Sequence, residues 1–275
     1  MIKYLLLPLL PILLCTCGSA PDNETIGQDV VTDVEEAIGF RIYEAENPPA
    51  PNFDLAGSDA EAIRIVDSLV KYHGGRETYD NTRYFTWNFF GARTLHWDKL
   101  DERVRIESAK DSTVYLVNYG EEPLTGKMSV NGVAVTDPEQ LAEGLARAKS
   151  MFINDSYWLV QQFKLLDDGV TLKLLPEVAA DSSANRPSYV IDQTFAGVGD
   201  TPQNRYRLYV DQETYAINHW AFYRDTADEE PAMQTPWQGY EPRGGLMLSG
   251  DRGGRFQLSG IDVPRRMDDE IFTEL

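Results

Sequence analysis

Apolar side chains recur at every second position over most of the chain between residues 85 and 263. The clearest case is Phe85, Trp87 and Phe89, which polar residues separate. Successive side chains of a strand point to opposite faces, so this period predicts strands that are buried on one face. Turn residues separate these segments, and Asn131-Gly132 is the strongest hairpin signal among them. The pattern predicts an α+β fold built on about 10–11 short antiparallel strands.

Three segments break this alternation with helical spacing. Residues 58–73 carry apolar side chains three and four positions apart, and Gly74-Gly75 follows as a stop signal. Thr136-Asp137-Pro138-Glu139 combines a capping box with proline at the first helical position, which predicts a helix to about residue 152. Asn154-Asp155 predicts the cap of another helix, which extends to about residue 163.

The N-terminus has the features of an export signal. Lys3 precedes an apolar run that two prolines interrupt, and the run is shorter than the roughly 20 residues of a membrane span. Leu14 lies three residues before Cys17, as in a bacterial lipobox. We therefore expect residues 1–16 to be a lipoprotein signal peptide and Cys17 to carry the lipid. A plain secretory signal cut after Ala20 is the alternative.

Acidic residues dominate the charge of the chain, with 44 Asp and Glu against 25 Lys and Arg and a net charge of -19. A phosphate backbone would be repelled by this surface, so the composition disfavours nucleic-acid binding. Residues 17–57 are especially acidic and contain four prolines, which predicts an extended tether. The remaining residues, 58–275, are predicted to form a single domain.

Residues that could carry chemistry are few. The chain has three histidines, His73, His96 and His219, and its two cysteines both lie near the N-terminus. His73 ends a predicted helix, where a cation suits the helix dipole. No spacing typical of a metal site, nucleophile elbow or phosphate loop is present. We therefore expect no catalytic residue, no metal and no cofactor. A periplasmic hydrolase using His219 or His73 stays open as the less favoured alternative.

Several motifs together resemble the LolA/LolB superfamily of bacterial envelope proteins, and more narrowly outer-membrane lipoproteins of Bacteroidota. These motifs are His73-Gly74-Gly75, Thr86-Trp87-Asn88-Phe89, Ile153-Asn154-Asp155-Ser156-Tyr157-Trp158-Leu159, Tyr209-Val210-Asp211-Gln212-Glu213-Thr214 and Gly244-Gly245-Leu246-Met247-Leu248-Ser249. The resemblance implies a curved antiparallel sheet, a half-open β-barrel, with helices covering its concave face. It also implies an apolar cavity for acyl chains.

Together, the alternation and the resemblance predict which residues would line such a cavity. They are Phe85, Trp87, Phe89, Leu95, Trp97, Val104, Ile106, Val114, Leu116 and Trp158, here called the predicted wall. The partners would be a lipid or the acyl chain of a lipoprotein, and the membrane through the N-terminal anchor. We expect a monomeric, lipid-anchored protein of the outer membrane that faces the periplasm. A structural or partner-binding lipoprotein with a filled core is the main alternative.

Overall fold

In the computed structural model, the structure describes residues 45–180 and 186–275, without the side chains of 177–180. Cys17, the predicted signal peptide and most of the predicted tether lie outside these residues. The helices are α2 (Ala60–Tyr72), α3 (Arg76–Asn81), α4 (Pro138–Val160) and α5 (Glu270–Thr273), and a 3₁₀ turn, η2 (Gln161–Phe163), follows α4. None of the helices in the described ranges is long and apolar enough to cross a membrane.

Nine strands form the larger antiparallel sheet, in the order β12-β13-β14-β1-β2-β3-β4-β5-β6. Their bounds are β1 (Tyr84–Phe89), β2 (Arg93–Asp98), β3 (Arg103–Ser108), β4 (Thr113–Asn118), β5 (Thr125–Val130), β6 (Val133–Ala134), β12 (Gln238–Arg243), β13 (Leu246–Arg252) and β14 (Phe256–Asp262). The first five strands are consecutive hairpins, and β14 returns to pair with β1.

Five further strands form a second ladder, in the order β11-β10-β9-β8-β7. They are β7 (Val170–Ala180), β8 (Pro187–Phe195), β9 (Arg205–Asp211), β10 (Ile217–Tyr223) and β11 (Met233–Pro236). Only Trp237 separates β11, which pairs with β10, from β12, which pairs with β13. The two ladders therefore share one long strand and form a large curved sheet that stays open. The described residues hold more strands than the sequence predicted, because the alternation does not show β6, β11 and β12.

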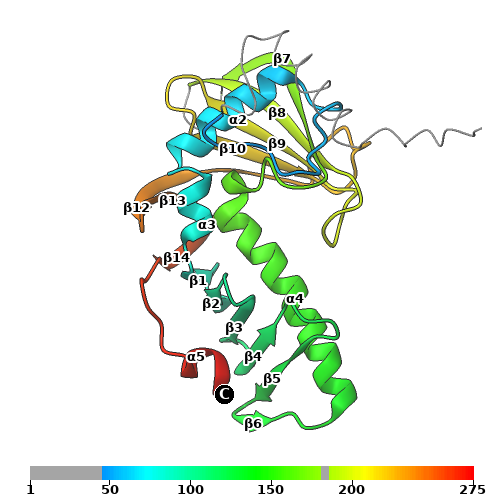
Figure 1. The fold of residues 1–275 in the computed structure, drawn as a ribbon, viewed down its shortest axis with the longest axis vertical. Coiled ribbons are helices and arrows are strands. Elements are labelled where there is room, and N and C mark those ends of the chain that lie inside the picture. The colour runs from blue at the N-terminus through cyan, green and yellow to red at the C-terminus, as the bar shows by residue number, and fades with distance from the viewer. Residues whose placement is uncertain (1–44, 181–185) are drawn as a thin grey trace, which may run out of the picture.

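Helices α2 and α4 cover the inner face of this sheet (Figure 1). Helix α4 crosses β3, β4 and β5, and its C-terminal part reaches β13, while α2 lies against β7. The predicted start of α4 is confirmed, since Pro138 is its first residue and the Asp137 carboxylate accepts a 2.9 Å hydrogen bond from the Gln140 amide. Close packing of α4 depends on Gly144, where a Cβ atom would lie 2.4 Å from the Met128 sulfur.

Residues 138–160 form one long helix, α4, where the sequence predicted two helices. Asp155 does not cap a helix but lies inside α4, where its side chain is fully buried. Its carboxylate receives the Arg93 guanidinium, with Nη2 2.7 Å from Oδ1, and Asn154 donates a further hydrogen bond. Burial raises the pKa of Asp155, and the paired Arg93 opposes that rise. A residue that reads as a cap therefore fastens the helix to β2.

The folded domain begins before the predicted boundary at residue 58. Asn47 is buried, and its backbone and side-chain amides both donate to the Asp67 carboxylate at 3.0 Å. Phe53 joins the main hydrophobic core. The predicted tether is therefore wrong for residues 45–57, which pack on α2 and on the edge of β7. The prediction rested on the acidic and proline content of this stretch, which does not show which of its residues contact the domain.

Candidate functional site

Nearly all of the predicted wall lies in a packed core. Seven of its members are 0–7% exposed and belong to one hydrophobic cluster with residues of α2 and α4: Phe85, Trp87, Phe89, Leu95, Trp97, Val104 and Ile106. Trp97 lies against Phe85 and Phe152, with ring centroids 5.1 and 5.2 Å apart. Side chains therefore fill the space that the wall was predicted to leave for a ligand.

Two members of the predicted wall lie on the other face of the sheet. Val104 pairs with Val117 and Ile106 with Tyr115, so Tyr115 and Val117 share the inner face. Val114 and Leu116 consequently point outward, which corrects the prediction for both. Leu116 is still buried, because the C-terminal segment passes over the outer face and Phe272 lines a small depression together with it. The burial of Leu116 thus comes from α5 and not from the core.

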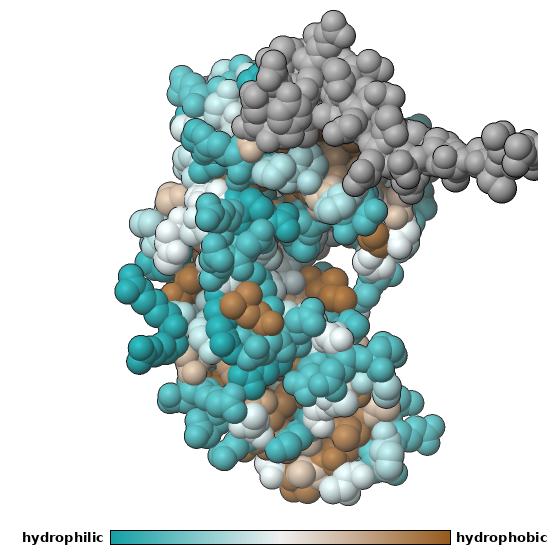
Figure 2. Space-filling model, in the orientation of Figure 1, coloured by the Kyte–Doolittle hydropathy of each residue, from teal (hydrophilic) through white to brown (hydrophobic). Residues whose placement is uncertain are grey.

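A cavity of about 640 Å³ opens at the C-terminal half of α4, between that helix and one end of the five-stranded ladder. Six aromatic side chains line it: Tyr157, Trp158, Phe195, Tyr206, Trp220 and Phe222. Trp158 is the one member of the predicted wall that does so. The volume of the cavity falls within the roughly 300–1,000 Å³ typical of small-molecule sites. On the face drawn in Figure 2, apolar side chains gather at mid-height of the molecule, where the surface is hollowed.

The six rings contact one another and form a continuous surface, here called the aromatic cavity. Tyr206 lies at its centre, with its ring centroid 5.1 Å from Tyr157, 5.5 Å from Trp220 and 5.3 Å from Phe222. Trp158 lies 4.8 Å from Trp220 and 4.9 Å from Phe90, so it links the two ladders. Edge-to-face and tilted contacts between the rings hold them in place around the open space.

Register explains why these residues meet. In the five-stranded ladder Phe222 pairs with Tyr206, and Tyr206 pairs with Gln193, so all three share the inner face. Gln193 is fully buried and accepts hydrogen bonds from the Tyr157 hydroxyl at 3.0 Å and from Gln161 at 3.1 Å. The hydrogen bond between Tyr157 and Gln193 fixes the Tyr157 ring against the five-stranded ladder. Burial also raises the Tyr157 pKa far above its usual value, so the hydroxyl stays neutral.

Sequence reasoning missed five of the six rings as a set. Phe195 ends β8, Tyr206 is near the start of β9 and Phe222 is near the end of β10, so one end of the ladder collects them. Inward-facing aromatic residues at the adjoining ends of neighbouring strands are the signal that could have found the site. Each strand was visible in the sequence, but their order in the sheet was not.

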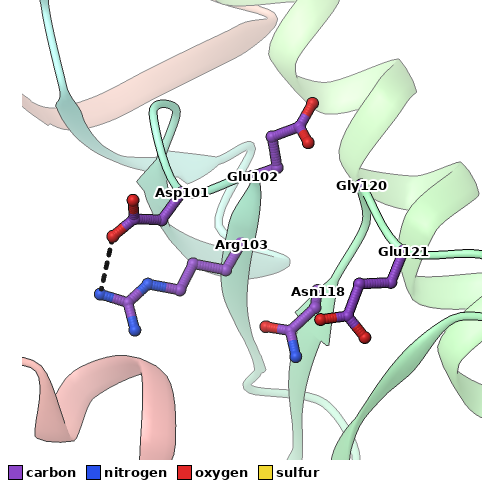
Figure 3. Close-up of a pocket in the computed structure, with 6 residues that line it drawn as sticks. All are labelled: Asp101, Glu102, Arg103, Asn118, Gly120 and Glu121. Atoms are coloured by element: carbon purple, nitrogen blue, oxygen red, sulfur yellow. Dashed lines mark ion pairs between the residues drawn. The ribbon is translucent and has the colours of Figure 1, made fainter.

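A second depression, of about 420 Å³, lies between the β2–β3 and β4–β5 turns (Figure 3). Its lining is polar: Asp101, Glu102, Arg103, Asn118, Gly120 and Glu121. Arg103 already pairs with Asp98 at 3.0 Å and Asp269 at 2.7 Å, and lies 3.6 Å from Asp101. These ion pairs tie the C-terminal segment to the sheet. Polar atoms make up most of this lining, so the depression suits a hydrophobic ligand poorly.

The histidines are part of the structure and do not converge on the cavity. His73 is fully buried at the end of α2, where its Nδ1 atom is 2.8 Å from the Leu69 carbonyl oxygen. Burial lowers its pKa to about 4, so it is neutral at pH 7 and not the exposed cation that its helix-end position suggested. His96 lies on β2, 3.0 Å from the Thr86 hydroxyl, and His219 lies on β10 beside the Tyr209 ring. In the described part of the chain, no three His, Cys, Asp or Glu side chains are grouped to hold a metal ion.

This buried histidine predicts that the domain loses stability in acid. The folded-state pKa of His73 is about 4, below the 6.5 of an exposed histidine, so its contribution is present above pH 6.5 and lost as pH falls towards 4. The shift corresponds to about 3 kcal/mol. Urea unfolding measures the free energy of unfolding at pH 7 and at pH 4. The loss between these two pH values should be smaller in His73→Leu than in the wild type by that amount. Carboxylates titrate alike in both proteins, so an unchanged difference would contradict the buried neutral state.

No protein-family model matches the chain, and no curated protein sequence matches it. The solved structures that the chain matches include a DUF1329 family protein from Desulfovibrio piger, at 14% identity and a TM-score of 0.42, covering 78% of this chain and 97% of that one. A LolA superfamily protein from Nitrosomonas europaea has 12% identity and a TM-score of 0.40, with coverage of 78% and 97%. An outer-membrane lipoprotein-sorting protein domain from Vibrio parahaemolyticus has 9% identity and a TM-score of 0.38, with coverage of 77% and 96%.

One of these neighbours is described as a LolA superfamily protein. The open curved sheet of this chain, with α2 and α4 on its inner face, is the fold that the resemblance of its motifs implies. The TM-scores of 0.38 to 0.42 carry no argument about function, and one fold carries many functions. What the protein does has to be argued from its own cavity.

Proposed function

We propose that this protein is a non-enzymatic lipoprotein of the bacterial envelope that binds or transfers a hydrophobic ligand in the periplasm. The ligand would be a lipid or an acyl chain, and it would occupy the aromatic cavity in place of the predicted wall. The observation that carries the proposal is the set of six contacting rings around about 640 Å³ of open space. Burying an acyl chain gains about 0.8 kcal/mol per methylene, so a chain of modest length offsets much of the cost of association.

Direct binding of an uncharged apolar probe tests this proposal. N-phenyl-1-naphthylamine should bind the purified protein at micromolar concentrations, with an increase in its fluorescence. Phe222→Asp should weaken that binding at least tenfold, about 1.4 kcal/mol, because the carboxylate must be desolvated beside the probe. Phe222 is half-buried, so the fold should tolerate the change.

Val133→Asp is the matched control for this measurement. It introduces the same charge at a side chain that is 70% exposed on β6, remote from the cavity. Its affinity for the probe should equal that of the wild type. Equal affinities for Phe222→Asp and wild type, with both folded by circular dichroism, would place the probe elsewhere and favour a structural or partner-binding role.

We also propose that Cys17 carries the membrane anchor. Leu14 at lipobox spacing and an apolar run too short to span a membrane support this. Cys17→Ser should move the protein from the membrane fraction to the soluble fraction, or leave it as a larger, unprocessed precursor. Stable anchoring needs more than one acyl chain, and Cys17 would carry the whole anchor. Its loss should therefore move nearly all of the protein to the soluble fraction. A variant that fractionates and migrates like the wild type would instead support the plain secretory signal.

A further inference from the structure

The charged groups around the aromatic cavity are mostly acidic. Lys164, Asp167, Asp168 and Asp200 contribute one positive charge and three negative charges to its lining. The Lys164 ammonium lies 2.7 Å from the Asp167 carboxylate, which also receives Arg76 at 2.8 Å. The single cation of the lining is therefore already paired, while an excess of carboxylate charge remains at the cavity.

The two remaining carboxylates of the lining, Asp168 and Asp200, are exposed. Asp168 follows η2 and accepts a 2.8 Å hydrogen bond from the backbone amide of Asn52, which carries no charge. Asp200 lies in the connection between β8 and β9. The whole chain, at -19, adds to the negative potential. An anionic head group would meet repulsion at this cavity, and a cationic one would meet attraction.

The rings supply a second, independent preference. The face of an aromatic ring is electron-rich and attracts a cation within about 6 Å of its centre, most strongly when water is excluded. Along the cavity, the Tyr206 ring contacts those of Tyr157, Trp220 and Phe222. Aromatic surfaces of this kind suit the low charge density of an alkylated ammonium group, whose methyl groups are also apolar.

We propose that the aromatic cavity selects single-chain amphiphiles whose head group is a cationic ammonium, and disfavours those with an anionic head. This inference rests on the proposed function, because the alkyl chain must first enter the cavity. The chain would lie against the rings, and the ammonium would lie between the ring faces and the carboxylates of Asp168 and Asp200. Selection would thus come from charge, and retention from apolar burial.

Three probes whose chains have ten carbon atoms, counting the carboxylate carbon of decanoate, test the selection: decyltrimethylammonium, decyl glucoside and decanoate, each below its micelle concentration. Calorimetric titration of the purified protein at low ionic strength should rank them in that order of affinity. The cationic probe should bind at least tenfold more tightly than decanoate. Added salt should narrow this ratio, because exposed carboxylates act through a screened field.

Matched variants separate the two sources of selectivity. Asp168→Asn with Asp200→Asn should reduce the ratio at least threefold and leave decyl glucoside unaffected. Phe222→Leu keeps an apolar side chain but removes one ring face, and should weaken the cationic probe about three- to tenfold more than it weakens decyl glucoside. Glu143→Gln, at an exposed position on α4 seven residues before Ser150, the first cavity-lining residue of that helix, removes the same kind of charge outside the lining and should change the ratio far less.

The possible outcomes are distinct. Equal or tighter binding of decanoate, or a ratio that the double variant leaves unchanged, would overturn the inference while the proposed function stands. Failure of all three probes to bind would overturn the proposed function and the inference with it. The predicted ranking, together with a ratio at least threefold smaller in the double variant, would support both.

Discussion

Substitution of Trp87 by alanine is expected to lower the free energy of unfolding by about 3–5 kcal/mol, the usual cost of removing a large aromatic side chain from a core. Trp87 is fully buried on β1, and its ring lies 6.5 Å from that of Trp97. The substitution leaves a void that packed neighbours on both sides cannot fill. Equilibrium unfolding in urea, with the midpoint and slope compared with the wild type, measures this loss.

The same variant also decides between the two locations considered for the ligand. Because the aromatic cavity lies elsewhere, the folded fraction of Trp87→Ala should bind N-phenyl-1-naphthylamine as the wild type does. Val133→Ala, at an exposed position, should leave both stability and binding unchanged. A Trp87→Ala protein of normal stability that no longer binds the probe would restore the predicted wall as the site.

Arg93→Ala is expected to cost about 3–5 kcal/mol, because it leaves the buried Asp155 carboxylate without its counter-ion. The Asp155 side chain has no exposed surface, and Arg93 forms two charge-assisted hydrogen bonds to it. The guanidinium also lies 5.0 Å from the centre of the Phe89 ring, so packing is lost as well. Urea unfolding at pH 7 measures the difference.

A double variant distinguishes an unpaired charge from general damage. Arg93→Ala with Asp155→Leu removes the buried charge too, and should recover part of the stability that Arg93→Ala loses. Arg64→Ala serves as the control, since its partner Glu61 is well exposed and such pairs contribute only about 0–1 kcal/mol. A loss below 1 kcal/mol for Arg93→Ala would show that water reaches Asp155 in solution.

The sequence predicted correctly which side chains of a strand point inward where apolar residues occupy only every second position. In β1, β2 and β3 the polar partners are unmistakable, and Trp87, Leu95 and Ile106 point inward as expected. In β4 both faces of the strand carry apolar side chains, because Val114, Tyr115, Leu116 and Val117 are consecutive. Pairing with β3 then decides the face, and that pairing is a tertiary fact.

The site was less predictable than the fold because it depends on neighbours far apart in the chain. Tyr157, Phe195 and Phe222 come from α4, β8 and β10 and meet only after the second ladder has formed. Local pattern also failed at Asp155, where a typical capping residue is paired with Arg93, 62 residues away in the chain. Composition likewise gave no sign that Asn47 and Phe53 belong to the domain.

The segment before α2 has a consequence for how copies of this chain can meet. Its residues occupy the outer edge of β7: the Asp54 and Asp59 amides donate to the Val170 and Leu172 carbonyls, and Ser58 and Asp59 side chains accept from the Leu172 and Leu174 amides. A bare edge of this length would act as a template for another strand. The opposite end of the sheet closes with β6, which is only two residues long. If an anchor crowds many copies onto one membrane surface, edge-to-edge polymerisation has little backbone from which to start.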